Sequence, residues 1–149
     1  MMLGKVVAAS VAVLVIVAGA YYLFGTQDHG DSGDGYTYIG TVEELADIGE
    51  DGKYRLSNDI DISRMPWIPK DGFKGELDGD GFRIIGMNVD DDDSSAYAGM
   101  FRVLESGGYV HDVTFVDANI LSGHSGVVAG LNKGKIENVS VYGFVGRTN

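Results

Sequence analysis

Hydrophobic residues follow two different patterns along the chain. Nineteen consecutive positions from Val6 to Phe24 carry no charge, and Ser10 is the one distinctly polar residue among them. After Gly35, apolar residues occur in short runs, often alternating with polar ones and separated by glycine, asparagine and aspartate. A long apolar run is typical of a membrane helix, whereas short alternating runs bounded by turn residues are typical of strands.

The apolar run predicts a transmembrane anchor or signal segment over residues 1–25. As a helix rising about 1.5 Å per residue, residues 6–24 would reach about 28 Å, the hydrocarbon thickness of a bilayer. Lys5 precedes the run and acidic residues follow it, so the positive-inside rule leaves the N-terminus in the cytoplasm. We therefore expect a single-pass protein of the cell membrane, held by residues 6–24, with its domain outside the cell.

A cleaved signal peptide is the alternative for this segment. Ala18-Gly19-Ala20 fits the small-residue pattern at cleavage sites, and a cut after Ala20 would give a secreted protein. The apolar run continues through Leu23 and Phe24, which favours an uncleaved anchor. A buried helix of a soluble protein is disfavoured because the run has no polar face.

Charge and composition narrow the chemistry. The chain has 22 Asp and Glu against 11 Lys and Arg, a net charge of −11, and a surface this acidic repels nucleic acid. Cysteine is absent, which excludes disulfides, thiolate metal sites and cysteine catalysis. Residues 26–40 are largely polar and glycine-rich and predict a flexible spacer before a domain over residues 41–149.

A short helix is expected where this domain begins. Thr41-Val42-Glu43-Glu44 is a capping box, in which the threonine and the second glutamate each cover an amide of the first turn. Val42, Leu45 and Ile48 lie on one stripe of the helix that follows. About two turns are too short to be stable alone, so we expect this stripe to cap the first layer of the fold.

The rest of the domain repeats itself. Three segments begin at Ile84, Val110 and Ile136, 26 residues apart, and each reads apolar, two others, apolar, polar, apolar. A second match, Gly99 to Leu104 with Gly126 to Leu131, has an interval of 27. Such a period is typical of stacked repeats. The two residues between the apolar positions predict a sharp bend, since a flat strand would turn its second half outward.

These features predict an all-β fold, a parallel β-helix (β-solenoid) of about three to four coils. Ile84, Val110 and Ile136 would form one column, with each coil hydrogen-bonded to the next at about 4.8 Å. A sandwich of hairpins is the alternative, but it gives no reason for a 26-residue interval. The domain ends shortly after its best repeat, so we expect it to be incomplete at its C-terminus or to stack end to end on a partner.

The stretch from Gly126 to Gly143, GVVAGLNKGKIENVSVYG, resembles the GLUG repeat of bacterial and archaeal surface proteins. Upstream, YRLSNDIDIS, Trp67-Ile68-Pro69 and FKGELDGDG resemble the region that usually precedes such repeats. The resemblance implies a right-handed β-helix of the kind found in adhesin-like exoproteins and in non-catalytic parts of some secreted peptidases. It implies an extracellular address and brings no shared catalytic residues.

Candidate binding chemistry is sparse. Asp90, Asp91, Asp92 and Asp93 form an acidic run that could supply oxygen ligands to calcium, although a solvated loop explains it equally. No other cofactor is indicated. Trp67 between two prolines could be an exposed platform for a sugar ring or could close one side of the core. His111 lies at a predicted corner and is expected to be solvated.

The sequence therefore favours a membrane-tethered extracellular β-helix with a binding or structural, adhesin-like role and no catalysis of its own. A glycan, a surface protein or a second copy of the chain is the expected partner. The alternative is a carbohydrate-active β-helix or the accessory domain of a secreted hydrolase. Asp59 and Asp61 would be its acid–base pair, because they share one face of a strand about 7 Å apart.

Overall fold

A computed structural model describes residues 13–17, 20–24, 33–91, 93 and 95–146. Its contacts divide the chain into a unit of residues 1–30 and a unit of residues 31–149. In the first unit, β1 (Val13–Val17) pairs antiparallel with β2 (Ala20–Phe24). Among the described residues, no helix is long and apolar enough to cross a membrane.

The described part of the apolar run thus forms two strands where the sequence predicts one helix. Four of the five residues of β1 are β-branched. Such side chains favour strands wherever no lipid forces the backbone to satisfy its hydrogen bonds within a helix. Residues 6–12, together with Ala18 and Gly19 of the predicted cleavage pattern Ala18-Gly19-Ala20, lie outside the described residues.

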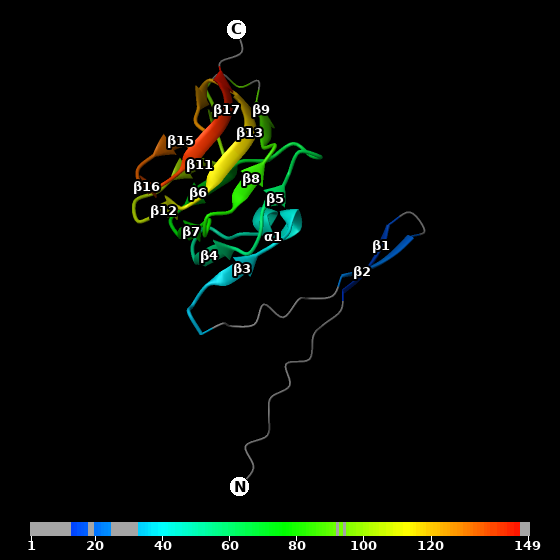
Figure 1. Cartoon of the computed structure of the whole chain (residues 1–149). Helices are drawn as coiled ribbons and strands as arrows, with labels where there is room; N and C mark the ends of the chain where they lie inside the picture. Colours follow the sequence, from blue (N-terminus) through cyan, green and yellow to red (C-terminus); the bar gives the residue numbers. More distant parts are fainter. Residues whose placement is uncertain (1–12, 18–19, 25–32, 92, 94, 147–149) are drawn as a thin grey trace. The chain divides into compact units, whose positions relative to one another are not determined.

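The second unit is a parallel β-solenoid of about three turns, as the repeat predicts (Figure 1). Its elements are β3 (Thr37–Ile39), α1 (Val42–Ala46), β4 (Lys53–Leu56), β5 (Ile60–Asp61), β6 (Lys70–Phe73), β7 (Glu76–Asp78), β8 (Arg83–Ile85), β9 (Asn88–Asp90), β10 (Tyr97–Ala98), β11 (Phe101–Leu104), β12 (Tyr109–His111), β13 (Thr114–Leu121), β14 (His124–Ser125), β15 (Ala129–Asn132), β16 (Lys135–Glu137) and β17 (Ser140–Gly146). β3 belongs to the fold although its residues fall in the predicted spacer.

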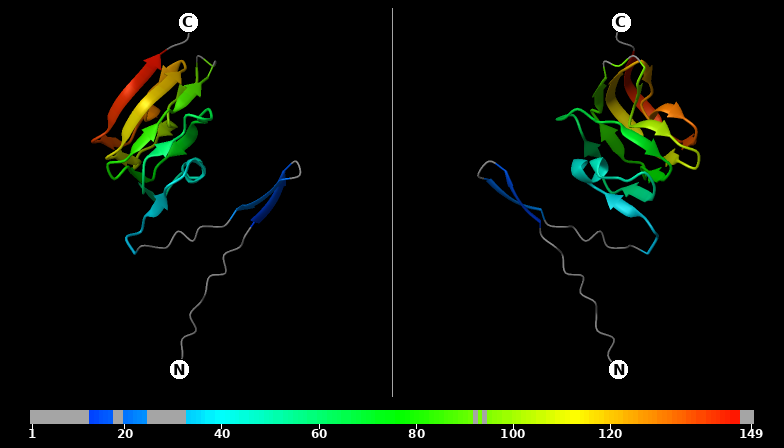
Figure 2. Two further views of the ribbon diagram at one scale, coloured as in Figure 1. Left: turned by 45° about the vertical axis from the view of Figure 1, so that its right-hand side comes forward. Right: turned by 180° about the vertical axis from the view of Figure 1, so that it is seen from behind.

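Three faces of parallel strands enclose the core. They have the strand orders β15-β11-β6, β16-β12-β7-β4-β3 and β17-β13-β8-β5, with β9 also paired to β13. Every strand pair described in this unit is parallel, whereas a sandwich of hairpins would need antiparallel pairs. Two further views show successive strands of one face lying one above another (Figure 2).

The predicted bends between faces are confirmed. Asp112 and Asn138 occupy equivalent corners of two successive turns, and both have left-handed backbone angles, φ 53° and 51°. Asp and Asn tolerate this conformation better than most residues because their short polar side chains can hydrogen-bond locally. Asp80, with φ 49°, lies in the corresponding corner after β7, whereas Gly86, with φ 75°, bends the chain between β8 and β9 at the level of Asp117 in β13. These residues let the chain turn while the apolar positions on both sides face inward.

The predicted column is correct for two of its three members. Val110 lies directly opposite Ile136, but its other neighbour is Leu77. Ile84 belongs to the next face, where it lies between Ile60 and Phe115. The loop between β9 and β10 lengthens one turn, so equivalent residues there are 31 or 33 positions apart and a fixed interval of 26 selects the wrong residue.

The N-terminal helix forms through the predicted capping box. The Thr41 hydroxyl accepts a hydrogen bond from the Glu44 amide, and the Glu44 carboxylate accepts one from the Thr41 amide. The helix ends at Ala46, sooner than expected, because the Asp47 amide donates to the Glu44 carbonyl in a tighter turn. Leu45 and Ile48 are buried in the core.

A pair of stacked aromatic rings lies in the core. Phe73 and Phe101 are fully buried, with ring centroids 4.4 Å apart and ring planes 9° from parallel. They come from β6 and β11, which neighbour each other in one face. Their contact therefore ties two successive turns together through side chains as well as backbone.

We expect Phe101→Ala to lower the free energy of unfolding by about 3–5 kcal/mol, since it leaves a cavity between two turns. Urea unfolding of the full chain in detergent micelles, followed by the fluorescence of the buried and only tryptophan, Trp67, measures this. Tyr142→Ala is the matched control, because Tyr142 is 65% exposed. Similar losses in both variants would contradict this core.

Candidate functional site

Polar side chains form two parallel rows across the outer face of the sheet with the strand order β16-β12-β7-β4-β3. Leu77 and Val110 point into the core, so the residues on either side of them point outward. The first row runs through Tyr38, Arg55, Asp78, His111 and Glu137, and the second through Lys53, Glu76, Tyr109 and Lys135. The first row takes one residue from each of the five strands and the second takes one from each of four, so the stacking of turns creates a site that no single segment contains.

His111 lies at the centre of these rows. Its Nε2 is 3.0 Å from Glu76 Oε1, while its Nδ1 is 2.6 Å from Asp112 Oδ2 and 3.7 Å from Asp78 Oδ1. The ring of Tyr109 stacks on the imidazole at 4.2 Å. The side chain of His111 is only 12% exposed, so the expectation of a solvated histidine is wrong.

Electrostatics in this cluster follow from burial and hydrogen bonding. Burial by itself would lower the pKa of His111, but hydrogen bonds to Asp112 and Glu76 outweigh it and raise that pKa above its usual value. Burial likewise opposes ionisation of Glu76, yet hydrogen bonds from Tyr36 and His111 leave the pKa of Glu76 below its usual value. The hydrogen bond with His111 is the main cause of the lowered pKa of Asp112.

Surrounding residues hold each carboxylate in place. Arg55 Nε donates to Asp78 Oδ2 at 2.8 Å, and its guanidinium lies 3.8 Å from the centre of the Tyr36 ring. The Tyr36 hydroxyl donates to Glu76 Oε1 at 2.5 Å. Asn138 Nδ2 donates to Asp112 Oδ1 from the next corner.

Next to the cluster, Tyr109 donates its hydroxyl proton to Glu137 at 2.6 Å, which raises the pKa of Tyr109 to about 12. Asp78, His111 and Asp112 each offer one ligand atom within 4.8 Å of the others, and among the described residues they are the group positioned to share a metal ion. The arrangement can therefore bind a cation or hold a proton on the imidazole.

The acidic run predicted to bind calcium lies elsewhere, beginning at Asp90, the last residue of β9, and continuing into the loop that follows. Asp91 pairs with Arg102 at 3.4 Å and accepts a hydrogen bond from the amide of Asp93, which in turn accepts hydrogen bonds from Ser95. Asp90 is exposed, and Asp92 lies outside the described residues. Calcium binding by this loop stays a prediction.

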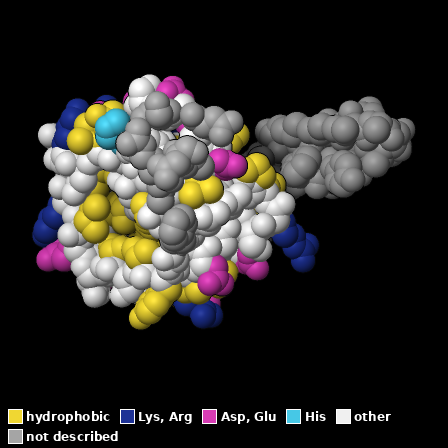
Figure 3. Space-filling model, turned by 90° about the horizontal axis from the view of Figure 1, so that it is seen from above, with side chains coloured by type: hydrophobic (Ala, Val, Ile, Leu, Met, Phe, Trp, Pro, Cys, Tyr) yellow, Lys and Arg dark blue, Asp and Glu magenta, His cyan; other side chains and the backbone are white. Residues whose placement is uncertain are grey.

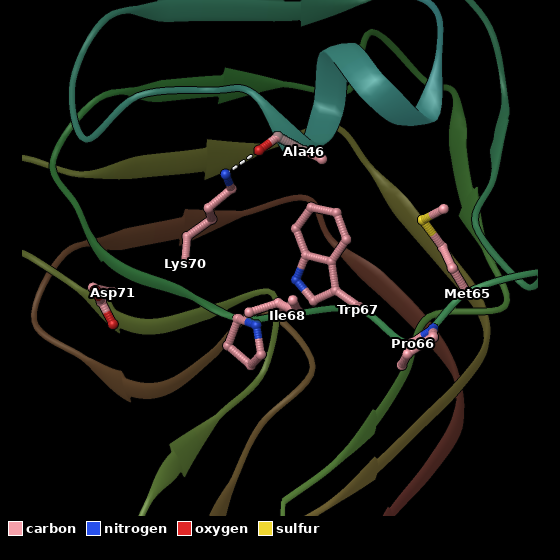
Figure 4. A pocket seen from close by; sticks show the side chains of 8 residues that line it. Ala46, Met65, Pro66, Trp67, Ile68, Lys70 and Asp71 are labelled. Atoms are coloured by element: carbon pink, nitrogen blue, oxygen red, sulfur yellow. Dashed lines mark hydrogen bonds between the residues drawn. The ribbon is translucent and has the colours of Figure 1, made fainter. Parts of the chain in front are cut away.

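Trp67 closes one side of the core. It is 6% exposed, and its indole Nε1 donates to the carbonyl of Met100 at 3.0 Å. It also lines a hollow of about 350 Å³ together with Ala46, Met65 and Lys70, whose ammonium group donates to the Ala46 carbonyl (Figure 4). The burial of Trp67 agrees with one of the two roles considered for it, closing one side of the core. The other role, binding a sugar ring at the hollow, stays a prediction.

Asp59 and Asp61, the predicted catalytic pair, each have a structural partner. Arg83 donates three hydrogen bonds to Asp59, from Nη2 at 2.6 Å, from Nε at 3.0 Å and from its amide at 2.8 Å, and these lower the pKa of Asp59. Asp61 accepts a hydrogen bond from the Ser63 amide at 2.9 Å, and its pKa is also lowered. Neither carboxyl has the raised pKa of a general acid.

The sequence did not reveal the cluster around His111 because its members are far apart in the chain. Glu76 is 35 positions from His111, and the two meet only because β7 pairs with β12. The repeat alignment could have found it, had Leu77 rather than Ile84 been matched to Val110. That choice places Asp78 beside His111.

Comparison with curated proteins finds two distant relatives. The chain is 28% identical to halomucin from Haloquadratum walsbyi over 177 residues, covering 98% of this chain and 2% of halomucin. It is 26% identical over 158 residues to a Gly-rich membrane protein of Evansella cellulosilytica, covering 90% of this chain and 18% of the relative. The chain thus spans a small part of both relatives. No family model and no solved structure matches it.

The pair formed by Asp59 and Arg83 predicts a pH dependence of stability. The pKa of Asp59 is lower in the folded protein than in the unfolded chain, so its contribution is present above about pH 4 and is lost as the pH falls through the folded value. We expect Asp59→Asn to lower the urea midpoint at pH 7 and to have no effect near pH 2. Asp51→Asn, at an exposed position, is the control. An equal effect of Asp59→Asn at both pH values would contradict this role.

Proposed function

We propose that this chain is a membrane-anchored, extracellular β-solenoid module with a structural role at the cell surface and no catalytic activity. The stack of parallel turns carries this proposal. Each turn is joined to the next by backbone hydrogen bonds, by core columns and by the outer polar rows, which makes a rigid support. A rigid stack of this kind suits a protein that holds other groups away from a membrane.

Two observations support the membrane location. The uncharged run of residues 6–24 has the length of a bilayer span. The Evansella relative, which matches over 90% of this chain, is named as a membrane protein. The likeness of Gly126–Gly143 to the GLUG repeat of surface proteins agrees with both. We infer from them that the solenoid is displayed outside the cell.

A catalytic role receives less support. Glycosidases use a carboxylic acid that stays protonated and a carboxylate that acts as base or nucleophile. Asp59 and Asp61 both have lowered pKa values and accept hydrogen bonds from neighbouring residues. For this reason we place the carbohydrate-active alternative second.

The last described turn leaves hydrophobic residues of the core columns exposed. Ile136, Val141 and Val145 lie directly above Val110, Phe115 and Ile120 in the core columns. The lower three are fully buried, whereas the upper three are 38%, 44% and 43% exposed. Hydrophobic side chains accordingly reach the surface on this end of the molecule (Figure 3). Another solenoid turn laid on β16 and β17 would cover them as they cover the turn below.

We propose a second copy of this chain as the occupant of that end. Two copies meeting through β15, β16 and β17 would pair their outer strands and bury both sets of exposed core residues in one symmetric contact. The opposite end is less suited to this contact, because Leu45 of α1 and Ile48 just after it are buried in the core there.

Single cysteines test the membrane topology, since the chain has none of its own. With Ser106→Cys, at an exposed turn, we expect a membrane-impermeant maleimide to label the protein in intact cells. With Met2→Cys, labelling should require permeabilised cells, because the positive-inside rule leaves that end in the cytoplasm. Labelling of Met2→Cys alone in intact cells, or recovery of the solenoid in the medium, would contradict the anchored arrangement.

Charged substitutions test the contact between copies. We expect the full chain in detergent micelles to associate with rising concentration in sedimentation velocity, and Val141→Lys to weaken association at least about tenfold, because it places a charge in the buried contact. Tyr142→Lys is the matched control. Tyr142 is the next residue along β17, and its own side chain is 65% exposed on the outer side. A protein that stays monomeric, or equal effects of both substitutions, would overturn this contact.

A further inference from the structure

We propose that Asp78, His111 and Asp112 form a binding site for a divalent transition-metal ion of the zinc type. The three residues come from β7, β12 and the corner that follows β12, so they belong to two successive turns. Their ligand atoms lie within 4.8 Å of one another. This site is independent of the function proposed above and would add metal binding to the outer face of the solenoid.

The spacing around His111 suits such an ion. Its Nδ1 faces both aspartates, at 2.6 Å from Asp112 Oδ2 and 3.7 Å from Asp78 Oδ1. Ligand atoms on a tetrahedral zinc ion, at about 2.0–2.1 Å from the metal, are about 3.3 Å from each other. The two separations lie on either side of that value, so a shared ion requires the Asp112 oxygen to move away from Nδ1 and the Asp78 oxygen to move toward it. One imidazole and two carboxylates are common zinc donors, and solvent would complete the coordination.

The other nitrogen of His111 is oriented as in known metal sites. A metal-bound histidine usually donates its second ring N–H to a carboxylate, which fixes the ring and raises its basicity. Here Nε2 lies 3.0 Å from Glu76 Oε1. Glu76 is itself held by the Tyr36 hydroxyl at 2.5 Å and by Lys53 at 3.6 Å. The ring is further restrained by its stacking on Tyr109.

The two aspartates are prepared in the same way. Asp78 uses Oδ2 to accept from Arg55, and its Oδ1 accepts from the amide of Asp80 at 2.8 Å while facing His111. Asp112 uses Oδ1 to accept from Asn138, which leaves Oδ2 facing the imidazole. Each aspartate therefore has one oxygen anchored by a side chain of a neighbouring strand or corner and the other directed to the same point.

Charge favours a dication at this point. Of the three carboxylates around His111, Glu76 pairs with Lys53 and Asp78 pairs with Arg55. The third, Asp112, contacts the imidazole of His111 and the neutral amide of Asn138. A negative charge therefore remains when the imidazole is neutral, as it must be to bind a metal. The low exposure of Asp78 and His111, 9% and 12% of their side chains, strengthens the attraction relative to a fully solvated acidic loop.

Calorimetric titration of the full chain with zinc chloride, in detergent micelles at pH 7.5 after removal of bound metals, tests the proposal. We expect one zinc ion per chain bound through His111. Glu76→Gln should weaken binding about tenfold because it perturbs the group that orients the imidazole. His111→Gln should weaken it more, and His124→Gln, which changes an exposed histidine of β14, should leave it unchanged.

Two further measurements make the outcome decisive. Zinc should shift the side-chain nitrogen resonances of His111 and leave those of His124 unchanged in histidine-detected NMR spectra. Urea unfolding followed through Trp67 checks that each variant is folded. Absence of zinc binding, or equal affinities of the His111→Gln and His124→Gln variants, would overturn the proposal. Zinc binding of unchanged affinity in His111→Gln would place the ion elsewhere on the chain, which also overturns the proposal.

Discussion

Everything in this domain depends on the parallel pairing of each turn with the next. That pairing satisfies the backbone hydrogen bonds of short strands, several of them only two or three residues long, which would not be stable alone. It also places equivalent side chains above one another. Val110 on Leu77 and Phe101 on Phe73 extend the core along the stack. The residues on either side of Leu77 and Val110 form the rows on the outer face.

The same stacking explains why the outer face carries an ionic cluster. Two levels meet around His111, because β7 supplies Glu76 and Asp78 while the corner after β12 supplies Asp112. Burying these carboxylates would be unfavourable without partners. Arg55 and Asn138, from the levels below and above, supply them. The cluster is consequently a property of the assembled solenoid, and we expect it to be lost whenever the turns separate.

Local features of the fold could be predicted well from the sequence. The capping box at Thr41 and the bends at Asp112 and Asn138 depend on residues within a few positions of each other. The stacking of Val110 and Ile136 follows from the regular interval of 26. Ile84 was misplaced because an inserted loop changes the length of one turn. The surroundings of His111 depend on that same register, so a single misalignment hid the candidate site.

The register of the turns can be tested directly by nuclear Overhauser effects in the methyl- and ring-labelled full chain in detergent micelles. We predict cross-peaks between the methyl groups of Val110 and both Leu77 and Ile136, and between the ring of Phe115 and the methyl groups of Ile84 and Val141. Cross-peaks from Val110 to Ile84 in place of Leu77, or the close Hα–Hα contacts of antiparallel strands, would contradict the stacked arrangement.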